Sequence, residues 1–351
     1  MTAKEINAAL VRTMKLLRAH RPAEAIPLIV PALAAAQRLD DPKLTFECAT
    51  EAGWAREYLD DHAGALAMFT VALAAAERLP PAERDSDRVA ESRLHWVTNA
   101  ADIPGIPAAR LLAVVDEVLA RAKTHRIRAD ALGRRSSILQ KIGQPEAAWE
   151  TAEQIIELLP HLETGDRFET LCEVAWIAEE TGHDERALSL YEEARRLPWQ
   201  GMPPLAEAMV LNGLGNLFLK VGRAEEAYSC ASDLMRAVAS MGPQPQHAAL
   251  GFMVDAARAV GRLDEAFEAA ERFLGSARVR GTADDTLLRA LIDSTNVRID
   301  RGGADVEVDG MLAEAEAIAA KVDASSGTTR WRDELAKIHA RRGMNQKETR
   351  P

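Results

Sequence analysis

Two segments of the sequence carry the same pattern of acidic and aromatic residues, Phe-Glu-x3-Glu-x2-Trp-x2-Glu. The first copy begins at Phe46 and the second at Phe168, 122 residues later. Steps of three and four residues bring the carboxylates and the indole onto one stripe of a helix, although like charges four residues apart weaken an isolated helix. The residues concerned are Glu47, Glu51, Trp54 and Glu57, followed by Tyr58, in the first copy, and Glu169, Glu173, Trp176 and Glu179 in the second.

An indole flanked by carboxylates could bind a cation. The face of a Trp ring attracts a guanidinium or ammonium group, and a Glu carboxylate accepts charge-assisted hydrogen bonds from it. The pattern therefore predicts two pockets that select a basic segment of a protein or peptide. The simpler interpretation is that Trp54 and Trp176 wedge between neighbouring helices while the carboxylates solvate the helix face.

Two amide side chains, Asn212 and Asn216, are one helical turn apart. A primary amide can donate to a peptide C=O and accept from a peptide N–H, so the pair could bracket the backbone of a bound peptide. An Asn can equally cap or bridge neighbouring helices. Further along, Lys220, Asp255 and Arg258 either continue a polar lining of mixed charge or form a solvated helix face, and Arg258 is a further candidate for ligand binding.

Residue types used for catalysis or for metal binding do not form a functional pattern in this sequence. The cysteines Cys48, Cys172 and Cys230 are widely spaced and include no CxxC pair. No His stands four residues from another His or beside a Ser or Cys. Gly213 and Gly215 lack the preceding strand of a phosphate-binding loop. We therefore expect no catalytic residue, no metal and no cofactor.

The charge and hydropathy of the chain exclude several classes of partner. The net charge is -11, from 54 acidic and 43 basic residues, which disfavours nucleic acid and anionic membrane surfaces. No run approaches the roughly 18 apolar residues of a membrane span, and the N-terminus lacks the apolar segment of a signal peptide. We expect a soluble cytoplasmic protein.

The elements that must position these side chains recur along the chain. A short turn followed by a helix-opening Ala returns in steps of 38 to 44 residues, which suits one helix hairpin per repeat of about 40. The longest step contains the two prolines of 101–108, where we expect an irregularity. Four turns contain a Gly that can end the preceding helix in the left-handed conformation. The recurring residues are Ala25, Ala65, Ala109, Ala147, Ala187, Ala227 and Ala266, and the glycines are Gly143, Gly182, Gly222 and Gly261.

The segment 211–227 resembles the tetratricopeptide repeat family, whose Leu, Gly, aromatic, Gly and Ala positions are matched by Leu214, Gly215, Phe218, Gly222 and Ala227. That family's repeat has about 34 residues, so the repeats here are lengthened, with the surplus between hairpins. The resemblance implies an all-α, right-handed superhelical solenoid of antiparallel helix hairpins, in which the first helix of each hairpin lines the concave face. It assigns to that face Met14, Trp54, Ser136, Trp176, Asn216 and Asp255.

We expect a single repeat domain over residues 1–342 with about seven to eight hairpins. Segments 284–299 and 308–322 form the last hairpin in this prediction. Segment 328–341 forms a polar C-terminal capping helix, which is needed because an end repeat has no neighbour. Residues 343–351 are polar and lack periodicity, which predicts a disordered tail.

Three functions are consistent with this fold. The first is a protein- or peptide-binding scaffold that uses the concave face of the superhelix. The second is a peptide- or ligand-responsive regulatory protein that acts through a partner, because helical repeat domains of this length resemble the sensing part of peptide-responsive bacterial regulators. The third is an enzyme with a polar cavity enclosed by the helical stack, for which the residue spacing gives no positive support.

Overall fold

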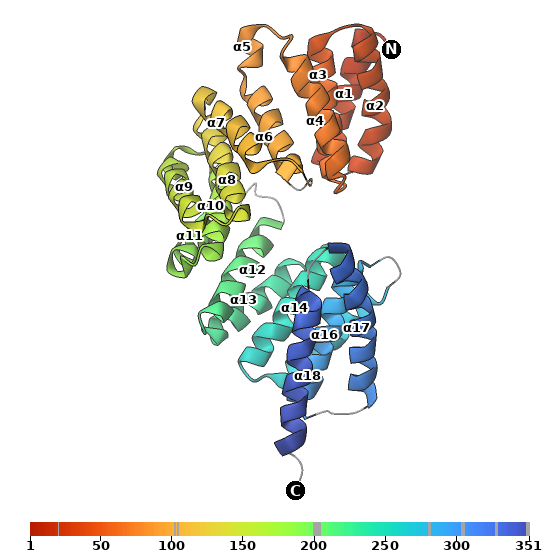
Figure 1. The fold of residues 1–351 in the computed structure, drawn as a ribbon, viewed down its shortest axis with the longest axis vertical. Helices are drawn as coiled ribbons and strands as arrows, with labels where there is room; N and C mark the ends of the chain where they lie inside the picture. The colour runs from red at the N-terminus through yellow and green to blue at the C-terminus, as the bar shows by residue number, and fades with distance from the viewer. Residues whose placement is uncertain are drawn as a thin grey trace. The chain divides into compact units, whose positions relative to one another are not determined.

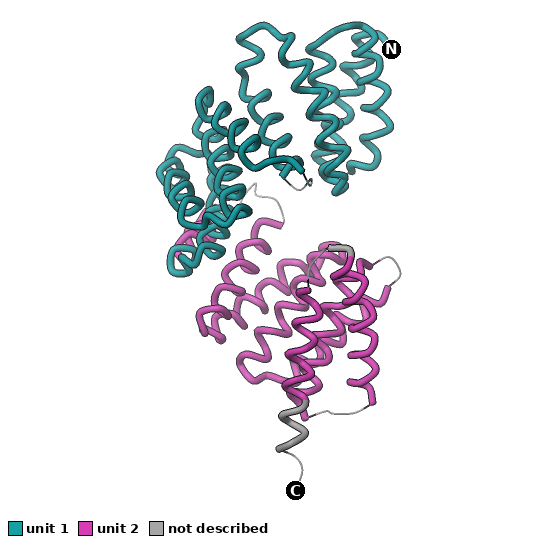
Figure 2. Tube along the Cα trace, in the orientation of Figure 1, with its two compact units in different colours: residues 1–187 teal, residues 188–351 magenta. Residues whose placement is uncertain are grey.

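The structure is a computed structural model and describes residues 1–19, 21–101, 103, 105–198, 205–279, 282–302, 306–326 and 329–348. Side chains are described over these ranges except at 325–326 and 343–348. The chain divides into two compact units, Met1–Ala187 (unit 1) and Leu188–Pro351 (unit 2), as Figure 2 shows. A single repeat domain over 1–342 therefore stays a prediction.

Every regular element in the described ranges is a helix (Figure 1). This confirms the predicted all-α repeat solenoid, while the hand of its superhelix stays a prediction. None of the described helices combines the length and the apolar character that crossing a bilayer requires.

Unit 1 consists of helices joined by short connections, and its boundary with unit 2 falls inside α11. The helices are α1 (Ala3–Arg18), α2 (Pro22–Arg38), α3 (Pro42–Glu57), α4 (His62–Ala76), α5 (Pro81–Arg84), α6 (Asp87–Ala101), α7 (Ala108–Arg121), α8 (His125–Lys141), α9 (Pro145–Leu158), the 3-10 turn η1 (Leu159–His161), α10 (Thr164–Glu180) and α11 (Asp184–Arg196).

Unit 2 continues the pattern and adds a final unpaired helix. Its helices are α12 (Leu205–Lys220), α13 (Ala224–Ala237), α14 (Pro243–Ala259), α15 (Leu263–Ala277), α16 (Asp284–Asp300), α17 (Val306–Ser326) and α18 (Arg330–Glu348).

Within each unit the helices form hairpins, and the hairpins stack in two layers. In unit 1, α1 packs on α2, α3 on α4, α6 on α7 and α8 on α9, and the first helices also contact each other, α1 with α3, α6 with α8 and α8 with α10. In unit 2, α12, α14 and α16 pair with α13, α15 and α17, and α12, α14, α16 and α18 contact one another in that order. One layer of each unit is therefore made of first helices, and we call it the inner layer.

The predicted helix stops are confirmed at the hairpin turns. Gly143, Gly182, Gly222 and Gly261 all have φ between 74° and 81°, a region that costs Gly little because it has no Cβ. The next backbone N–H reaches back across the turn, for example from the residue after Gly222 to the Phe218 carbonyl at 2.8 Å. This bond defines a Schellman motif, which satisfies the last carbonyls of the first helix.

The recurring small residue marks where the second helix meets the first. Ala25, Ala65, Ala187, Ala227 and Ala266 are fully buried at the fourth residue of their helices. An Ala at this crossing lets two helix backbones approach closely.

Two of the seven recurring positions were predicted wrongly. Ala147 is only half-buried and Ala109 is exposed, whereas Ala148 and Leu111 are buried. The reason is that α9 and α7 begin at Pro145 and Ala108, after the N-caps Gln144 and Pro107, so that Ala148 and Leu111 are the fourth residues.

A glycine in the first helix makes room for an aromatic ring of the same unit. A Cβ added to Gly215 would lie 2.0 Å from Cζ of Phe252, and one added to Gly53 would lie 2.8 Å from Cζ of Phe69. Both distances are too short for any side chain. The family-like glycine of segment 211–227 thus lets α14 pack against α12.

The C-terminal helix is fixed to unit 2 by a buried carboxylate. Asp323 of α17 accepts hydrogen bonds from the backbone N–H groups of Trp331 and Arg332, at 3.3 and 3.1 Å, and so caps the start of α18. Leu335 and Ile338 are buried in the adjoining core. The helix continues to Glu348, past the predicted end at residue 341 and into the predicted tail, while 349–351 lie outside the described residues.

The two kinds of helical glycine predict opposite effects of the same substitution. Gly215→Ala inserts a methyl group into the Phe252 ring and should lower the free energy of unfolding by about 1–3 kcal/mol. Gly275 in α15 has nothing within 4 Å of an added Cβ, so Gly275→Ala should raise it by about 0.5–1 kcal/mol. Urea unfolding followed by circular dichroism measures both, and equal effects of the two substitutions would contradict the packing described here.

Candidate functional site

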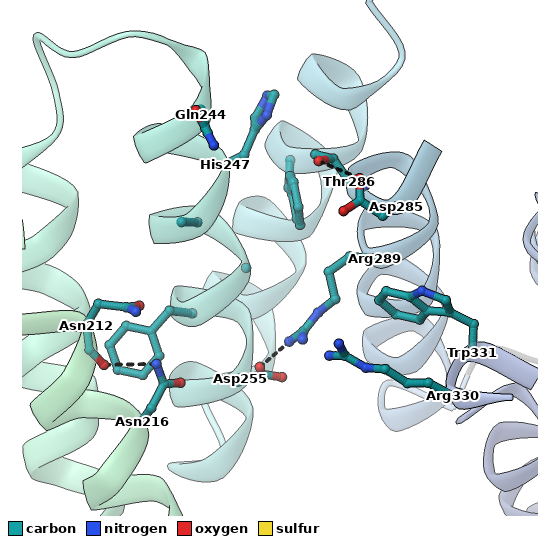
Figure 3. Close-up of a pocket in the computed structure, with 14 residues that line it drawn as sticks. Asn212, Asn216, Gln244, His247, Asp255, Asp285, Thr286, Arg289, Arg330 and Trp331 are labelled. Carbon is teal, nitrogen blue, oxygen red and sulfur yellow. Dashed lines mark hydrogen bonds and ion pairs between the residues drawn. The ribbon is translucent and has the colours of Figure 1, made fainter. Parts of the chain in front are cut away.

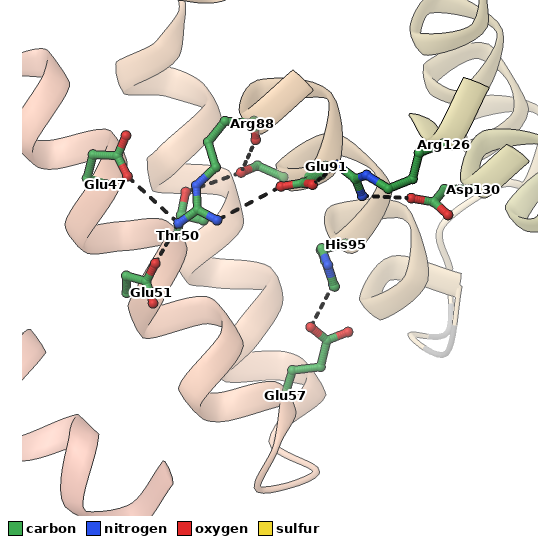
Figure 4. Close-up of polar contacts among 10 residues, drawn as sticks. Glu47, Thr50, Glu51, Glu57, Arg88, Glu91, His95, Arg126 and Asp130 are labelled. Atoms are coloured by element: carbon green, nitrogen blue, oxygen red, sulfur yellow. Dashed lines mark hydrogen bonds and ion pairs between the residues drawn. The ribbon is translucent and has the colours of Figure 1, made fainter. Parts of the chain in front are cut away.

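The first copy of the acidic and aromatic stripe lies on α3, and its carboxylates face the next hairpin (Figure 4). The Glu51 side chain is 2% exposed and accepts a hydrogen bond from Nη2 of Arg88 at 2.5 Å. Glu47 lies 3.8 Å from the same guanidinium. Burial raises the pKa of Glu51, although the charge of Arg88 acts to lower it. The buried carboxylate is therefore paired from within unit 1.

Arg88 also covers the face of the indole that the stripe would offer to a cation. Its guanidinium carbon lies 4.1 Å from the centroid of the Trp54 ring, which is within the range of a cation-π contact. The predicted combination of a carboxylate and an indole is thus present on α3, with an arginine of α6 in the place expected for a ligand. A basic ligand would have to displace Arg88.

Glu57 and Tyr58, at the end of α3, have different surroundings. Glu57 pairs with Nδ1 of His95 at 2.8 Å and accepts a hydrogen bond from the Asn99 amide at 3.3 Å. The His95 ring stacks on Phe69 with 5.4 Å between centroids. Tyr58 is the C-cap residue of α3 and is 58% exposed. Glu57 is therefore held in place by α6, the next first helix.

Charged pairs continue across the inner layer of unit 1 as far as α10. Glu91 of α6 pairs with Arg126 of α8, Arg126 lies 3.3 Å from Asp130, and Arg134 lies 3.5 Å from Glu173 of α10. Burial raises the pKa of both Asp130 and Glu173. We name these contacts, with those of Arg88, the inner ion-pair ladder. It joins Glu51, Glu91 and Glu173 to arginines of neighbouring first helices.

The second copy of the stripe, on α10, is more open than the first. Trp176 is 45% exposed, and no guanidinium of the described residues lies over its ring. Glu169 is exposed, Glu173 belongs to the ladder, and Glu179 is half-buried. The two copies therefore share a sequence pattern but not an environment.

One predicted inner-face position, Ser136, is wrong. Ser136 is fully buried, and its hydroxyl donates to the carbonyl of Ala148 in the second helix at 2.8 Å. The error follows from the shift of the recurring Ala from Ala147 to Ala148, which moves the register of α8 by one residue. The following residue, Ser137, is half-buried instead.

Unit 2 contains a cavity of about 410 Å³ in its inner layer (Figure 3). The predicted pair Asn212 and Asn216 lines it, so two of the proposed ligand-binding residues share one cavity. Its other polar and aromatic lining comes from Gln244, His247, Phe252 and Asp255 of α14, Phe273 of α15, Asp285, Thr286 and Arg289 of α16, and Arg330 and Trp331 of α18.

The amide groups of this cavity are available to a ligand. The Asn216 amide donates to the backbone carbonyl of Asn212 at 2.9 Å, which orients its oxygen and its remaining N–H. Among the described residues, the side chains of Asn212 and Gln244 have no hydrogen-bond partner. An amide that is accessible and uncommitted can bind a backbone N–H or C=O.

The apolar part of the cavity is aromatic. Phe252 and Phe273 are 4% and 3% exposed, and the centroid of the His247 ring lies 5.6 Å from that of Phe273. Burial lowers the pKa of His247, which favours the neutral ring near pH 7. The cavity can thus receive an apolar side chain beside its amide groups.

The charged part of the cavity is organised around Arg289. Its Nε donates to both carboxylate oxygens of Asp293 at 2.9 Å, and its Nη2 donates to Asp255. Asp293 is 2% exposed, and burial raises its pKa to about 7 in spite of the neighbouring Arg289. Arg330 is exposed and forms no ion pair with the described residues; it lies over its neighbour Trp331, 4.9 Å from the ring centroid.

The predicted residue Arg258 lies in an adjoining cavity of about 300 Å³. Its Nε donates to Asp300 at 2.7 Å, and Asp255 is 3.9 Å away. Both cavities are lined by Asp255, Arg289 and Arg330. Arg258 therefore pairs with an acid of α16 and does not line the cavity that contains the amide pair.

Several cavity residues were missed by sequence reasoning. The recurring Ala was traced only to Ala266, so the register was not extended to Arg289 on α16. Arg330 and Trp331 belong to a helix interpreted only as a polar cap. Arg289 follows Asp255 by only 34 residues, less than the repeat of about 40, so counting repeats along the sequence would not have found it.

Other reactive groups are not gathered into a site. In the ranges that the structure describes, no three His, Cys, Asp or Glu residues are placed to hold a metal ion. Cys48, Cys172 and Cys230 are buried, and burial raises the pKa of Cys48 and Cys172 to about 12. These two thiols are thus poor sources of a thiolate nucleophile near neutral pH.

Comparison with known proteins supports the fold. No protein-family model and no curated protein matches the sequence. A Rap protein solved with competence and sporulation factor is 16% identical, with 99% of each chain covered and a TM-score of 0.54. A signal transduction ATPase with a tetratricopeptide repeat sensor from Pyrococcus horikoshii is 13% identical over 97% of this chain and 53% of its own, with a TM-score of 0.59. Yeast Tom70 is 15% identical over 94% and 62%, with a TM-score of 0.55. The predicted resemblance to tetratricopeptide repeats is confirmed.

The inner ion-pair ladder predicts a coupled loss of stability in unit 1. Glu51→Ala leaves Arg88 without its nearest acid, and because Arg88 is partly exposed we expect a loss of about 1–3 kcal/mol. The double variant Glu51→Ala, Arg88→Ala should lose less than the sum of the single variants. Glu47→Ala is the control, with a loss below about 0.5 kcal/mol, because that carboxylate is more distant and more exposed. Strictly additive losses would show that the pair contributes nothing.

The buried Asp293 predicts a pH dependence with a definite sign. Its pKa of about 7 exceeds the roughly 3.9 of an unfolded Asp, so the folded chain retains a proton that the unfolded chain releases between about pH 4 and 7. Stability from Asp293 is therefore present at low pH and is lost as the pH rises through this window. The unfolding free energy of the wild type minus that of Asp293→Asn should decrease from about pH 4 to 7 in urea titrations. A constant or increasing difference would contradict the burial of this carboxyl.

Proposed function

We propose that this chain, with its tetratricopeptide-like repeat fold, binds a peptide segment of another protein in the cavity of unit 2. The observation that carries the proposal is the combination of open amides, Asn212 and Gln244, with an aromatic floor. Amides can pair with a peptide backbone, while Phe252 and Phe273 can cover an apolar side chain. Because several first helices contribute side chains to the cavity, the site would contact an extended length of the peptide.

The likeness to known structures supports the same function. The Rap protein that was solved with competence and sporulation factor has a related fold over the whole length of both chains. At 16% identity this argues for a shared architecture, and the cavity residues of this chain carry the argument for binding. The ligand is therefore proposed from its chemistry alone.

Unit 1 contributes a second, weaker contact in this proposal. Arg88 already occupies Trp54, so a basic residue of the partner would use the open copy of the stripe, with Trp176 as the stacking face and Glu169 as the exposed carboxylate. The basic segment expected from the sequence is thus proposed for α10 alone.

A second candidate function is regulation through a partner. It is favoured by one observation: α18 supplies Arg330 and Trp331 to the cavity, while its first backbone N–H groups depend on Asp323. A ligand in the cavity would therefore stabilise the docked position of α18. A surface formed or covered by this helix would then respond to the ligand.

Peptide binding can be tested on the full-length protein with an array of random heptapeptides whose ends are blocked. The double variant Asn212→Ala, Asn216→Ala removes hydrogen bonds worth about 1–3 kcal/mol together, so affinity for the selected peptides should fall about 5- to 150-fold. Gln154→Ala on α9 is the control, since this amide is exposed on a second helix of unit 1.

Two results would oppose the proposal. If no peptide of the array bound to the protein, the proposed function would be wrong. An unchanged affinity in the Asn double variant, measured by fluorescence anisotropy with the selected peptides, would move the binding site away from this cavity.

A further inference from the structure

Two guanidinium groups point into the same part of the unit 2 cavity. Arg289 reaches in from α16 and Arg330 from the start of α18 (Figure 3), and both residues line this cavity and the adjoining one. Like charges repel each other unless an anion lies close to both. Their convergence from two separate helices therefore needs a counter-charge.

The acids of the cavity do not supply that counter-charge to Arg330. Asp255 and Asp293 both accept hydrogen bonds from Arg289, and the nearest described contact of Arg330 is the Trp331 ring. Arg289 is fully compensated, whereas Arg330 brings a positive charge that no described acid pairs. Asp285, the other carboxylate of the first cavity, accepts from the backbone N–H of Thr286 at 2.7 Å, and Glu334, which lines the adjoining cavity, pairs with Lys337 at 3.2 Å.

Arg289 is also held in a fixed orientation. Its Nε and Nη2 are bound by the two acids, and no described residue accepts a hydrogen bond from its Nη1. A guanidinium fixed from behind loses little side-chain entropy when its remaining N–H groups bind a ligand. The planar fork of a guanidinium matches the geometry of a carboxylate better than an ammonium group does.

We propose that the peptide bound by unit 2 carries an acidic side chain, Asp or Glu, whose carboxylate lies between Arg289 and Arg330. This inference rests on the proposed function and specifies the ligand for it. A free inorganic anion would pair with the arginines but would leave the Asn212 amide and the aromatic floor unused, so a peptide fits the cavity more completely. Helix α18 is then part of the binding site as well as the cap of the stack.

The two inner faces then have opposite charge preferences. In unit 1 the carboxylate of Glu51 pairs with an arginine of the protein itself, Arg88. In unit 2 an arginine of the protein, Arg330, would bind a carboxylate of the ligand. The difference depends on a side chain of α18, which is outside the hairpin repeat.

The test uses peptides selected from the array, each resynthesised with its acidic residue changed to the matching amide. For the wild type we expect the amide version to bind about tenfold more weakly, the loss typical of one charge-assisted contact. In Arg330→Gln the acidic and amide versions should bind with the same affinity. Arg330→Lys should retain part of the preference, because a charge remains without the planar fork.

The matched control is Arg278→Gln, which removes the same charge from an arginine paired with Glu314 on the second-helix layer. It should retain the tenfold preference. An equal loss in Arg278→Gln and Arg330→Gln would overturn the inference, as would selected peptides without a common acidic residue. Both results leave peptide binding itself intact. Inorganic phosphate that displaces the peptides from the wild type and from Arg330→Gln equally would also count against the arginine pair.

Discussion

The close crossing of each second helix on its first helix is the constraint on which the structure depends. A fully buried Ala at the fourth residue, as in Ala227 and Ala266, brings the two backbones together, and the left-handed glycine before it reverses the chain within a few residues. Because successive hairpins pack side by side, their first helices meet along one layer. Side chains one repeat apart in sequence, such as Glu51 and Arg88, therefore become neighbours.

The same layer serves two different purposes in the two units. In unit 1 the acids and arginines of α3, α6, α8 and α10 are close enough to pair, and burial makes an unpaired charge costly. The charges of the inner ion-pair ladder are thus balanced within the unit. In unit 2 the side chains of Asn212 and Gln244 have no hydrogen-bond partner among the described residues, and the glycine at 215 makes room for Phe252 at the floor of the cavity. Accessible polar groups above an aromatic surface are what a binding site requires.

Much of the fold was predictable because its signals are local. Gly182 and Gly222 end helices through a backbone preference that does not depend on distant residues. The recurring Ala failed only at Ala109 and Ala147, where the first residue of the helix was misplaced and the register moved with it. The site was less predictable: Asn212 and Asn216 were identified from their spacing, whereas Arg330 lies in a helix that carries no repeat signal.

The sequence by itself determined the helical repeat, its length of about 40 residues and the side chains available on the first helices. Only the tertiary structure decided which of those side chains remain available. Trp54 and Trp176 occupy equivalent positions in identical patterns, yet Arg88 lies over one of them and the other is 45% exposed. The physical reason is that pairing depends on what the neighbouring helix places within a few ångströms, which spacing along a single helix does not encode.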